Sequence, residues 1–316
     1  MALFGFGTAA VDFRVSTADL GVEYKDKLLA RTVMALGGGA TANSLCQAAR
    51  LGSDAQWLGK IGTDPVGVQI LNDLAASGVR TEHVIAVDGA LSPFNVAVYA
   101  GPTNRRVGGF LLANSLSELT TDEANSLGEV PGPGDWCLVE IGEVPLEMVL
   151  AFCKRAAHRG ASLVLDVDLD PVAQCVDGSI KLIQSVFQYA DFILPNVAAI
   201  RSLYDSDDPA EIVRAVSRDT GKPAVVTAGA AGSFFSTDGF TVDHVAAFPV
   251  DVIDTVGAGD AFHGSFLWAL SRAESLRTAV EIASVCGAAN CTAFGARSGM
   301  LDRDALELTR KDGRRT

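Results

Sequence analysis

Short apolar runs alternate with longer helical stretches through most of this 316-residue chain, and this alternation limits the folds open to it. Each run is bounded by glycine, proline or acidic residues and is too short for a helix, which is typical of buried strands. Strands that are separated by helices usually pair in parallel, with helices covering both faces of the sheet. The pattern therefore predicts an α/β fold with a mostly parallel central sheet and helices on both faces. The expected strands include residues 2–6, 55–62, 136–141, 162–168, 191–196 and 224–229, and the expected helices include 40–52, 65–78, 145–160, 179–189, 197–204, 209–218, 258–271 and 275–294.

Two segments depart from this alternation and indicate a small β appendage. The stretch "FNVAVYAGPTNRRVGGFLL" (94–112) has the pattern of two strands around the turn "GPTN", and residues 14–36 lack a core-helix pattern. We therefore expect a β lid formed by approximately 13–36 and 81–112. No repeat, low-complexity tract or proline-rich linker divides the chain, so residues 1–316 are expected to form one domain that carries this lid.

Composition excludes some classes of partner. The net charge of −13 argues against binding to nucleic acid or to an anionic membrane, because both require clustered Lys and Arg. No run is long and apolar enough to span a membrane, and the N-terminus lacks the basic region of a signal peptide. The six cysteines form no C-x-x-C pair, and only four histidines are available for a zinc-type cluster. These features favour a cytoplasmic protein.

The stretch "DTVGAGDAFHGSF" (254–266) combines a glycine-spaced turn with the start of a helix. Gly257 and Gly259 free the backbone to present consecutive N–H groups, and a helix N-terminus binds anions. An ionised Asp260 beside such an anion site suits phosphoryl transfer, as a base that accepts the proton of a hydroxyl. Read alone, the same stretch also fits an ordinary capped helix after a glycine turn.

A second glycine cluster, "GGGATAN" (37–43), leads into a helix and lets the backbone approach a small ligand. Asn43 could bond hydroxyl groups through both ends of its amide, and Asp12, after the first strand, could bind two sugar hydroxyls. Neither a G-x-G-x-x-G nor a G-x-x-x-x-G-K-[ST] motif is present. A packing turn and an exposed turn acid explain the same residues, as a plain hairpin explains "VTAGAAG" (226–232).

Two charged groups carry weaker functional interpretations. Asp166, Asp168 and Asp170 alternate in "LDVDLDP" at a strand end, where carboxylates could bind a divalent metal, although the rest of a calcium loop is missing. Arg105 and Arg106 follow a predicted turn and could reach an anionic ligand, but a solvated hairpin tip explains them better.

Taken in order, these motifs resemble the PfkB, or ribokinase-like, family of carbohydrate kinases. The resemblance rests on "GTAAVD", "GGGATANSLCQAARLG", "WLGKIGTDPVG" and "DTVGAGDAFHGSF", of which the last is the family's most specific signature. The stretches "LPN" (194–196) and "VTAGAAG" also fall at the family's usual places, so the match spans nearly the whole chain.

The resemblance implies an ATP-dependent kinase acting on a primary hydroxyl of a sugar or sugar derivative, with a β lid that closes over the sugar. Magnesium would arrive with ATP, potassium serves many members, and a homodimer through the lid is expected because lids of this family often pair. Matched to the family's motifs, the catalytic residues are Asp260, Gly257, Ala258 and Gly259; the substrate-binding residues are Asp12, Gly38, Gly39, Asn43, Phe94, Asn95, Arg106 and Glu143; the nucleotide-binding residues are Asn196, Thr227, Gly229, Gly232 and Ser284; and a monovalent-cation site uses Asp254 and the backbone of Val256.

Two departures from the family pattern bear on cofactors, and two alternative functions stay open. Ala199 stands where the family usually has a Glu that organises metal and water, and Ser284 stands near the adenine where an Asn is common.

The tail "CTAFGARSGM" and "LDVDLDP" look most like ketohexose-type members. A nucleoside kinase of the same fold would need an aromatic platform, which Phe13, Phe94 or Tyr99 could supply. A regulator that has lost catalysis is the other alternative, and Ala199 is its main support.

Overall fold

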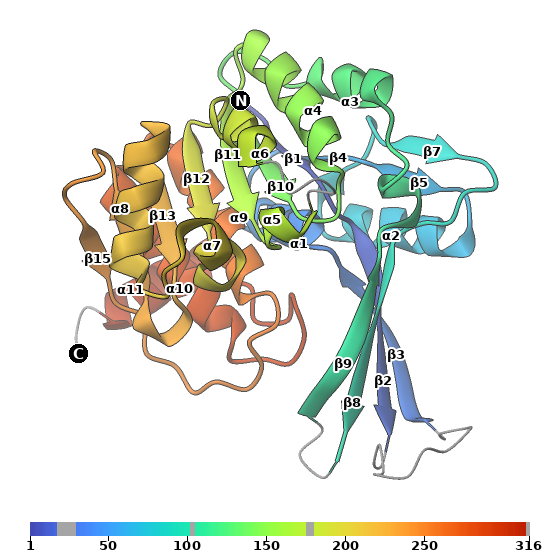
Figure 1. The fold of residues 1–316 in the computed structure, drawn as a ribbon. Coiled ribbons are helices and arrows are strands. Elements are labelled where there is room, and N and C mark those ends of the chain that lie inside the picture. Colours follow the sequence, from blue (N-terminus) through green and yellow to red (C-terminus); the bar gives the residue numbers. More distant parts are fainter. Residues whose placement is uncertain (18–29, 102–104, 175–179, 314–316) are drawn as a thin grey trace.

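The computed structural model describes residues 1–17, 30–101, 105–174 and 180–313, and these form a layered body from which a narrow arm of strands projects (Figure 1). The strands are β1 (Leu3–Phe6), β2 (Ala10–Thr17), β3 (Ala30–Gly38), β4 (Ala55–Leu58), β5 (Lys60–Gly62), β6 (Val79–Arg80), β7 (Ile85–Val87), β8 (Phe94–Ala100), β9 (Arg105–Leu112), β10 (Trp136–Ile141), β11 (Ser162–Val167), β12 (Phe192–Pro195), β13 (Ala224–Thr227), β14 (Ser233–Ser236) and β15 (Asp243–Val245). The helices are α1 (Ala40–Arg50), α2 (Pro65–Ala76), α3 (Thr121–Gly128), α4 (Leu146–His158), α5 (Pro171–Gln174), α6 (Ile180–Phe187), α7 (Val197–Tyr204), α8 (Pro209–Thr220), α9 (Ala258–Ser271), α10 (Leu276–Asn290) and α11 (Arg303–Gly313).

The central sheet has nine strands in the order β15-β14-β13-β12-β11-β10-β1-β4-β6. From β6 to β13 every neighbouring pair is parallel, and β14 and β15 add an antiparallel edge. This arrangement confirms the predicted mostly parallel sheet. Within the described residues, no helix combines the length and the apolarity that crossing a membrane requires.

The strands are apolar on both faces because helices cover both sides of the sheet. In β10, Cys137, Val139 and Ile141 pack with the helices α3, α4, α6 and α8, whereas Leu138 packs with α9, α10 and α11. Side chains alternate between the faces of a strand, so Glu140 shares the face of Leu138. The same alternation places Asp166 on the face of Val164, and both acids therefore point toward the layer that contains α9.

Two expected boundaries were wrong. Residues 55–62 were expected to form one strand, but the chain leaves the main sheet after Leu58, and β5 pairs instead with β7. The last long helix was expected to reach residue 294, but α10 ends at Asn290 because the chain then turns back: the N–H groups of Ile253 and Asp254 donate to the carbonyl oxygen of Cys291 at 2.8 and 3.2 Å. Helices α3 and α11 were not anticipated.

The projecting arm is a separate four-stranded sheet in the order β3-β2-β8-β9, hereafter the small sheet. It uses residues 10–17, 30–38, 94–100 and 105–112, whereas residues 85–87, which fall inside the expected lid segment, pair with β5. Residues 18–29 and 102–104 of the expected lid lie outside the described residues. The small sheet begins where β1 ends, so it stands at the carboxyl edge of the parallel strands, the usual ligand-binding edge of such sheets.

Candidate active site

Two buried carboxylates stand side by side where β10 and β11 end. Glu140 and Asp166 are register partners in the parallel pair, and each residue is only 1% exposed. Glu140 accepts hydrogen bonds from the N–H and hydroxyl groups of Thr8 at 2.8 and 2.9 Å, and from those of Thr41 at 3.2 and 2.6 Å. Burial raises the pKa of Glu140 and the threonine bonds oppose that rise. This carboxylate joins the end of β1 to the first turn of α1.

Asp166 has a different partner, His263 of α9. The imidazole Nδ1 lies 2.9 Å from Asp166 Oδ2, and both side chains are buried. Burial lowers the pKa of His263, but the contact with Asp166 and the charges of Asp260 and Asp168 together raise it, so the net shift is upward. The surrounding acids therefore favour the charged form of His263, one helical turn after Asp260.

Asp260 lies in the first turn of α9, behind a glycine turn. Gly257 has a φ of 77°, and a Cβ at this position would come within 2.2 Å of the carbonyl oxygen of Ala296, so no other residue fits. In the described part of the chain, the N–H groups of Gly257, Gly259 and Asp260 find no acceptor, whereas Ala258 N–H donates to Thr255 at 3.3 Å. Unpaired N–H groups at a helix start form an anion site.

Asn43 of α1 contacts Asp260 directly and is itself held by Arg297. Asn43 Nδ2 donates to Asp260 Oδ2 at 2.6 Å, and Asn43 Oδ1 accepts from Arg297 Nε at 2.6 Å. Arg297 also donates to the carbonyl oxygen of Gly38 at 3.2 Å and forms an ion pair with Asp73. Arg297 was not anticipated, because it is a lone cation in "CTAFGARSGM" that no motif spacing marks. Its position fixes which end of the Asn43 amide faces Asp260.

Polar groups from the small sheet and from the loop after β10 face one another near Asp12. Asn95 Nδ2 donates to Asp12 Oδ1 at 2.7 Å, and the charge of Asp12 contributes to raising the pKa of Glu143. Burial is the main cause of that rise, to about 8, and Glu140 adds to it. Among the described residues, Asn95 Oδ1 and Glu143 Oε2 are buried without a hydrogen-bond partner. Buried polar atoms without partners mark a place for ligand hydroxyl groups.

Other predicted substrate residues surround this group. Gly39 caps the start of α1, and Gly38 ends β3 opposite Ala10. Phe94 opens β8 and meets Phe13 edge to face, with ring centroids 5.9 Å apart. Arg106 lies in β9 in register with Tyr99, and its side chain lies outside the described residues.

A pocket of about 560 Å³ opens on the other side of the α9 start. Ser284 Oγ is buried there without a partner among the described residues, which again marks a place for a ligand. Asn196, by contrast, is absent from the lining: its Oδ1 caps α7 by accepting the N–H of Ala199 at 2.8 Å, and its backbone bridges to Thr227. The predicted residues that line the pocket are Thr227, Gly229, Gly232, Ala258, Gly259 and Ser284.

The comparisons with known proteins agree with this geometry. The model of the pfkB family of carbohydrate kinases matches residues 3–303. The chain belongs to this family. It is 28% identical over 301 residues to a ribokinase of Bacillus subtilis, covering 95% of this chain and 96% of the relative, and 28% identical over 291 residues to a fructokinase of Klebsiella pneumoniae, covering 85% and 90%. The structure of Arabidopsis thaliana ribokinase complexed with ribose and ATP has the same fold, with a TM-score of 0.82 at 20% identity over 98% of this chain and 99% of the other.

This carbohydrate kinase therefore presents a helix start with N–H groups that are unpaired within the described residues. The protein is a sugar kinase, and the first residues of α9 in its family signature "DTVGAGDAFHGSF" line the pocket of about 560 Å³. Toward the small sheet, Asp12, Asn95 and Glu143 form a group of polar side chains, hereafter the polar cluster.

The aspartates of "LDVDLDP" in this kinase do not converge on one point. Asp166 faces His263, whereas Asp170 Oδ1 accepts from the N–H of Val172 at 2.9 Å and from the hydroxyl of Ser202 at 2.7 Å. Burial, Asp166 and Glu140 raise the pKa of Asp168 to about 8. In the part of the chain that the structure describes, no group of three or more His, Cys, Asp or Glu side chains could hold a metal ion.

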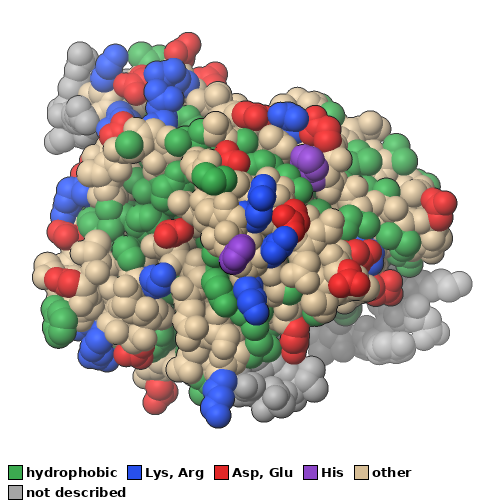
Figure 2. Space-filling view, turned by 90° about the horizontal axis from the view of Figure 1, so that it is seen from above, with side chains coloured by type: hydrophobic (Ala, Val, Ile, Leu, Met, Phe, Trp, Pro, Cys, Tyr) green, Lys and Arg blue, Asp and Glu red, His purple; other side chains and the backbone are tan. Residues whose placement is uncertain are grey.

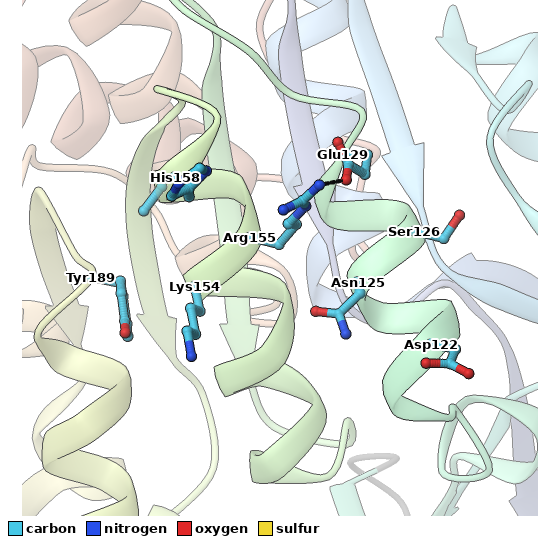
Figure 3. Close-up of a pocket in the computed structure, with 9 residues that line it drawn as sticks. Asp122, Asn125, Ser126, Glu129, Lys154, Arg155, His158 and Tyr189 are labelled. Atoms are coloured by element: carbon cyan, nitrogen blue, oxygen red, sulfur yellow. Dashed lines mark hydrogen bonds and ion pairs between the residues drawn. The ribbon is translucent and has the colours of Figure 1, made fainter.

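A larger pocket of about 830 Å³ lies away from these residues, between α3 and α4 (Figure 3). Lys154 and His158 project from α4 and Asp122 from α3, while Arg155 is ion-paired with Glu129. Basic and acidic side chains are interspersed over the face of the molecule seen from above (Figure 2). This pocket contains none of the residues that the family signature places, so it is not the catalytic site.

We predict that Asp166→Asn lowers the pKa of His263, because the charge that opposes the effect of burial is then removed. NMR titration of the imidazole signals measures this pKa. Asp170→Asn is the matched control, since Asp170 faces Val172 and Ser202 instead, and it should leave the His263 titration unchanged. An unaltered pKa in Asp166→Asn would show that this pair does not set the charge of His263.

Proposed function

We propose that this kinase transfers the γ-phosphoryl group of ATP to a primary hydroxyl of a sugar, with Asp260 as the general base. One observation carries the proposal: Asp260 stands beside unpaired N–H groups at the edge of a pocket, and the polar cluster contains buried atoms without hydrogen-bond partners among the described residues. The acceptor sugar belongs beside the polar cluster of Asp12, Asn95 and Glu143, and ATP belongs in the pocket that Ser284 lines. The names of the ribokinase and fructokinase relatives favour a pentose or a ketohexose as the acceptor.

In the proposed reaction, the sugar hydroxyl oxygen attacks the γ-phosphorus, and its proton passes to the Asp260 carboxylate. The new O–P bond forms as the bond to the leaving oxygen of ADP breaks, and Asp260 later releases the proton to solvent. The N–H groups of Gly257 and Gly259, which are unpaired among the described residues, would hold the charge on the transferred oxygens. Ala258 N–H already donates to Thr255, so it contributes less than the sequence analysis expected.

The acids around Asp260 fit a nucleotide that brings Mg²⁺ with it. Burial and the charges of Asp166 and Glu140 raise the pKa of Asp168, and His263 opposes the rise. Mg²⁺ is bound by one or two carboxylates together with substrate phosphates and water, so a complete protein cage is not required. Asp168 is the residue that we propose to face this ion, since position 199, where the family usually has Glu, carries a buried Ala.

The small sheet is proposed to act as a lid over the sugar. It contributes Asp12, Phe94 and Asn95 from neighbouring strands, so closure would bring hydrogen-bonding groups to the acceptor and exclude water.

A nucleoside acceptor is the second candidate, because the Phe13 and Phe94 rings already form an aromatic pair that could face a base.

We predict that Asp260→Asn lowers turnover by about 10²- to 10⁴-fold, the usual contribution of a general base, while sugar binding is retained. ADP release is measured over a panel of pentoses, ketohexoses and nucleosides with Mg²⁺ and ATP, and binding is followed by thermal shift. Asp251→Asn, an exposed acid of the same loop, is the matched control and should be fully active. Normal turnover in Asp260→Asn would overturn the mechanism. Ligand binding by the wild type without any ADP release would indicate a regulator instead.

We predict that kcat/KM falls about ten-fold per pH unit below pH 7 and is level above it. Burial raises the pKa of Asp260 to about 7, with Asp166 and Glu140 adding to the rise and Asn43 and His263 opposing it. A base is active only when ionised, so acidification through this pKa removes activity. Asn43→Ala removes a hydrogen bond that lowers this pKa and should move the midpoint to higher pH. A profile that is level down to pH 5 would contradict the assignment.

We also propose a homodimer formed through the small sheet. Its strands β3 and β9 are sheet edges, and they expose the apolar side chains of Val33, Met34, Val107, Phe110 and Leu111. We expect Phe110→Glu to reduce the mass measured by analytical ultracentrifugation to that of a monomer. Phe240→Glu, which alters a similarly exposed ring outside the small sheet, is the control and should leave the dimer intact. A monomeric wild type would refute this proposal.

A further inference from the structure

A buried arginine of the small sheet reaches the loop that leads into α9. Arg14 is 8% exposed, and its Nη1 lies 3.7 Å from Asp254 Oδ2. The guanidinium carbon lies 3.4 Å from the centroid of the Tyr99 ring and 3.6 Å from that of the Phe294 ring. Stacking between two aromatic rings suits a planar guanidinium, which keeps its charge when buried. Arg14 thus places a permanent positive charge next to the Asp254 carboxylate.

The oxygens expected to bind a monovalent cation are already engaged by hydrogen-bond donors. Asp254 Oδ1 accepts the N–H of Val256 and Oδ2 accepts the N–H of Gly295, both at 3.1 Å. The carbonyl oxygen of Val256 accepts from Asn290 Nδ2 at 3.1 Å, and the same amide nitrogen donates to Ala296 at 3.0 Å. An alkali cation needs several oxygens in place of its water shell. A further cation beside Asp254 would also be repelled by Arg14. These residues do not fit a potassium site.

We propose that Arg14 takes the place of a monovalent cation at Asp254, so that the small sheet, and not a bound ion, holds the loop before α9. The loop from Asp254 to Gly257 carries the turn that exposes the N–H groups beside Asp260. Arg14 belongs to β2, the strand that also carries Asp12. The position of the small sheet and the shape of the anion site are therefore linked through one side chain. Arg14 acts here as a positioning residue, and the enzyme works without potassium.

The first test measures cation binding without turnover. Thermal unfolding of the wild type is compared in KCl, NaCl and choline chloride at equal ionic strength. A cation that binds only the folded protein raises the melting temperature with its concentration. We expect KCl and choline chloride to give the same melting temperature. A saturable rise specific to KCl would overturn the proposal whatever the protein catalyses, so this result stands apart from the proposed kinase activity.

The second test separates the role of Arg14 from a general effect of charge in the small sheet. With the best acceptor sugar, wild-type kcat should be equal in KCl and choline chloride. Arg14→Met should lower kcat at least about ten-fold, as expected when one partner of a buried charge pair is lost. Arg31→Met, at an exposed position in β3, is the matched control and should keep wild-type kcat.

Arg14→Lys keeps the charge but loses the planar stacking, and it covers the case in which Arg14→Met does not fold. We expect Arg14→Lys to fold and to retain potassium-independent turnover, with a kcat between those of the wild type and Arg14→Met. Potassium stimulation of the wild type, or wild-type kcat in a folded Arg14→Met, would overturn the proposal.

Discussion

The pair of carboxylates at the ends of β10 and β11 is the constraint on which the site depends. Two buried acids on adjacent parallel strands repel each other, so each must be compensated by a different neighbour. Glu140 is compensated by four donors from Thr8 and Thr41, and Asp166 by His263. These partners belong to the end of β1, to α1 and to α9. The contacts that compensate the two carboxylates therefore position the first turns of α1 and α9, which carry Asn43 and Asp260.

The close approach of those two helices completes the arrangement. A Cβ at Gly264 of α9 would lie 2.0 Å from the carbonyl oxygen of Ser44, so α9 can approach α1 only because this residue has no side chain. The short distance between the helices lets Asn43 reach Asp260 at 2.6 Å. Arg297 then orients the Asn43 amide. The reactivity of the carboxylate is thus set by burial and like charges on one side and by a fixed donor on the other.

Sequence reasoning anticipated those features that are local in the chain. Alternating apolar runs indicated the parallel sheet, and the glycine spacing around Asp260 indicated a helix start with exposed N–H groups. Contacts between distant segments were beyond it. Arg297 bonds Asn43 across 254 positions, and nothing near either residue signals the other. His263 lies within the expected helix 258–271, and nothing near it in the sequence indicates its contact with Asp166 of β11. The motif predicts that Asn196 binds nucleotide, which stays a prediction, and the sequence did not indicate that its side-chain oxygen caps α7.

The contact of Arg14 with Asp254 shows why a motif does not define a site by itself. The signature "DTVGAGDAFHGSF" fixes the loop and its acid, but the charge that faces that acid comes from a strand of another sheet. A bound ion would leave the loop independent of the small sheet. Arg14, in contrast, belongs to β2 and cannot move unless the small sheet moves with it. The same strand supplies Asp12, which is hydrogen-bonded to Asn95 of β8. If sugar binds at Asp12 as proposed, sugar binding and the geometry of the anion site would both depend on β2, and the small sheet would support catalysis as well as cover the sugar.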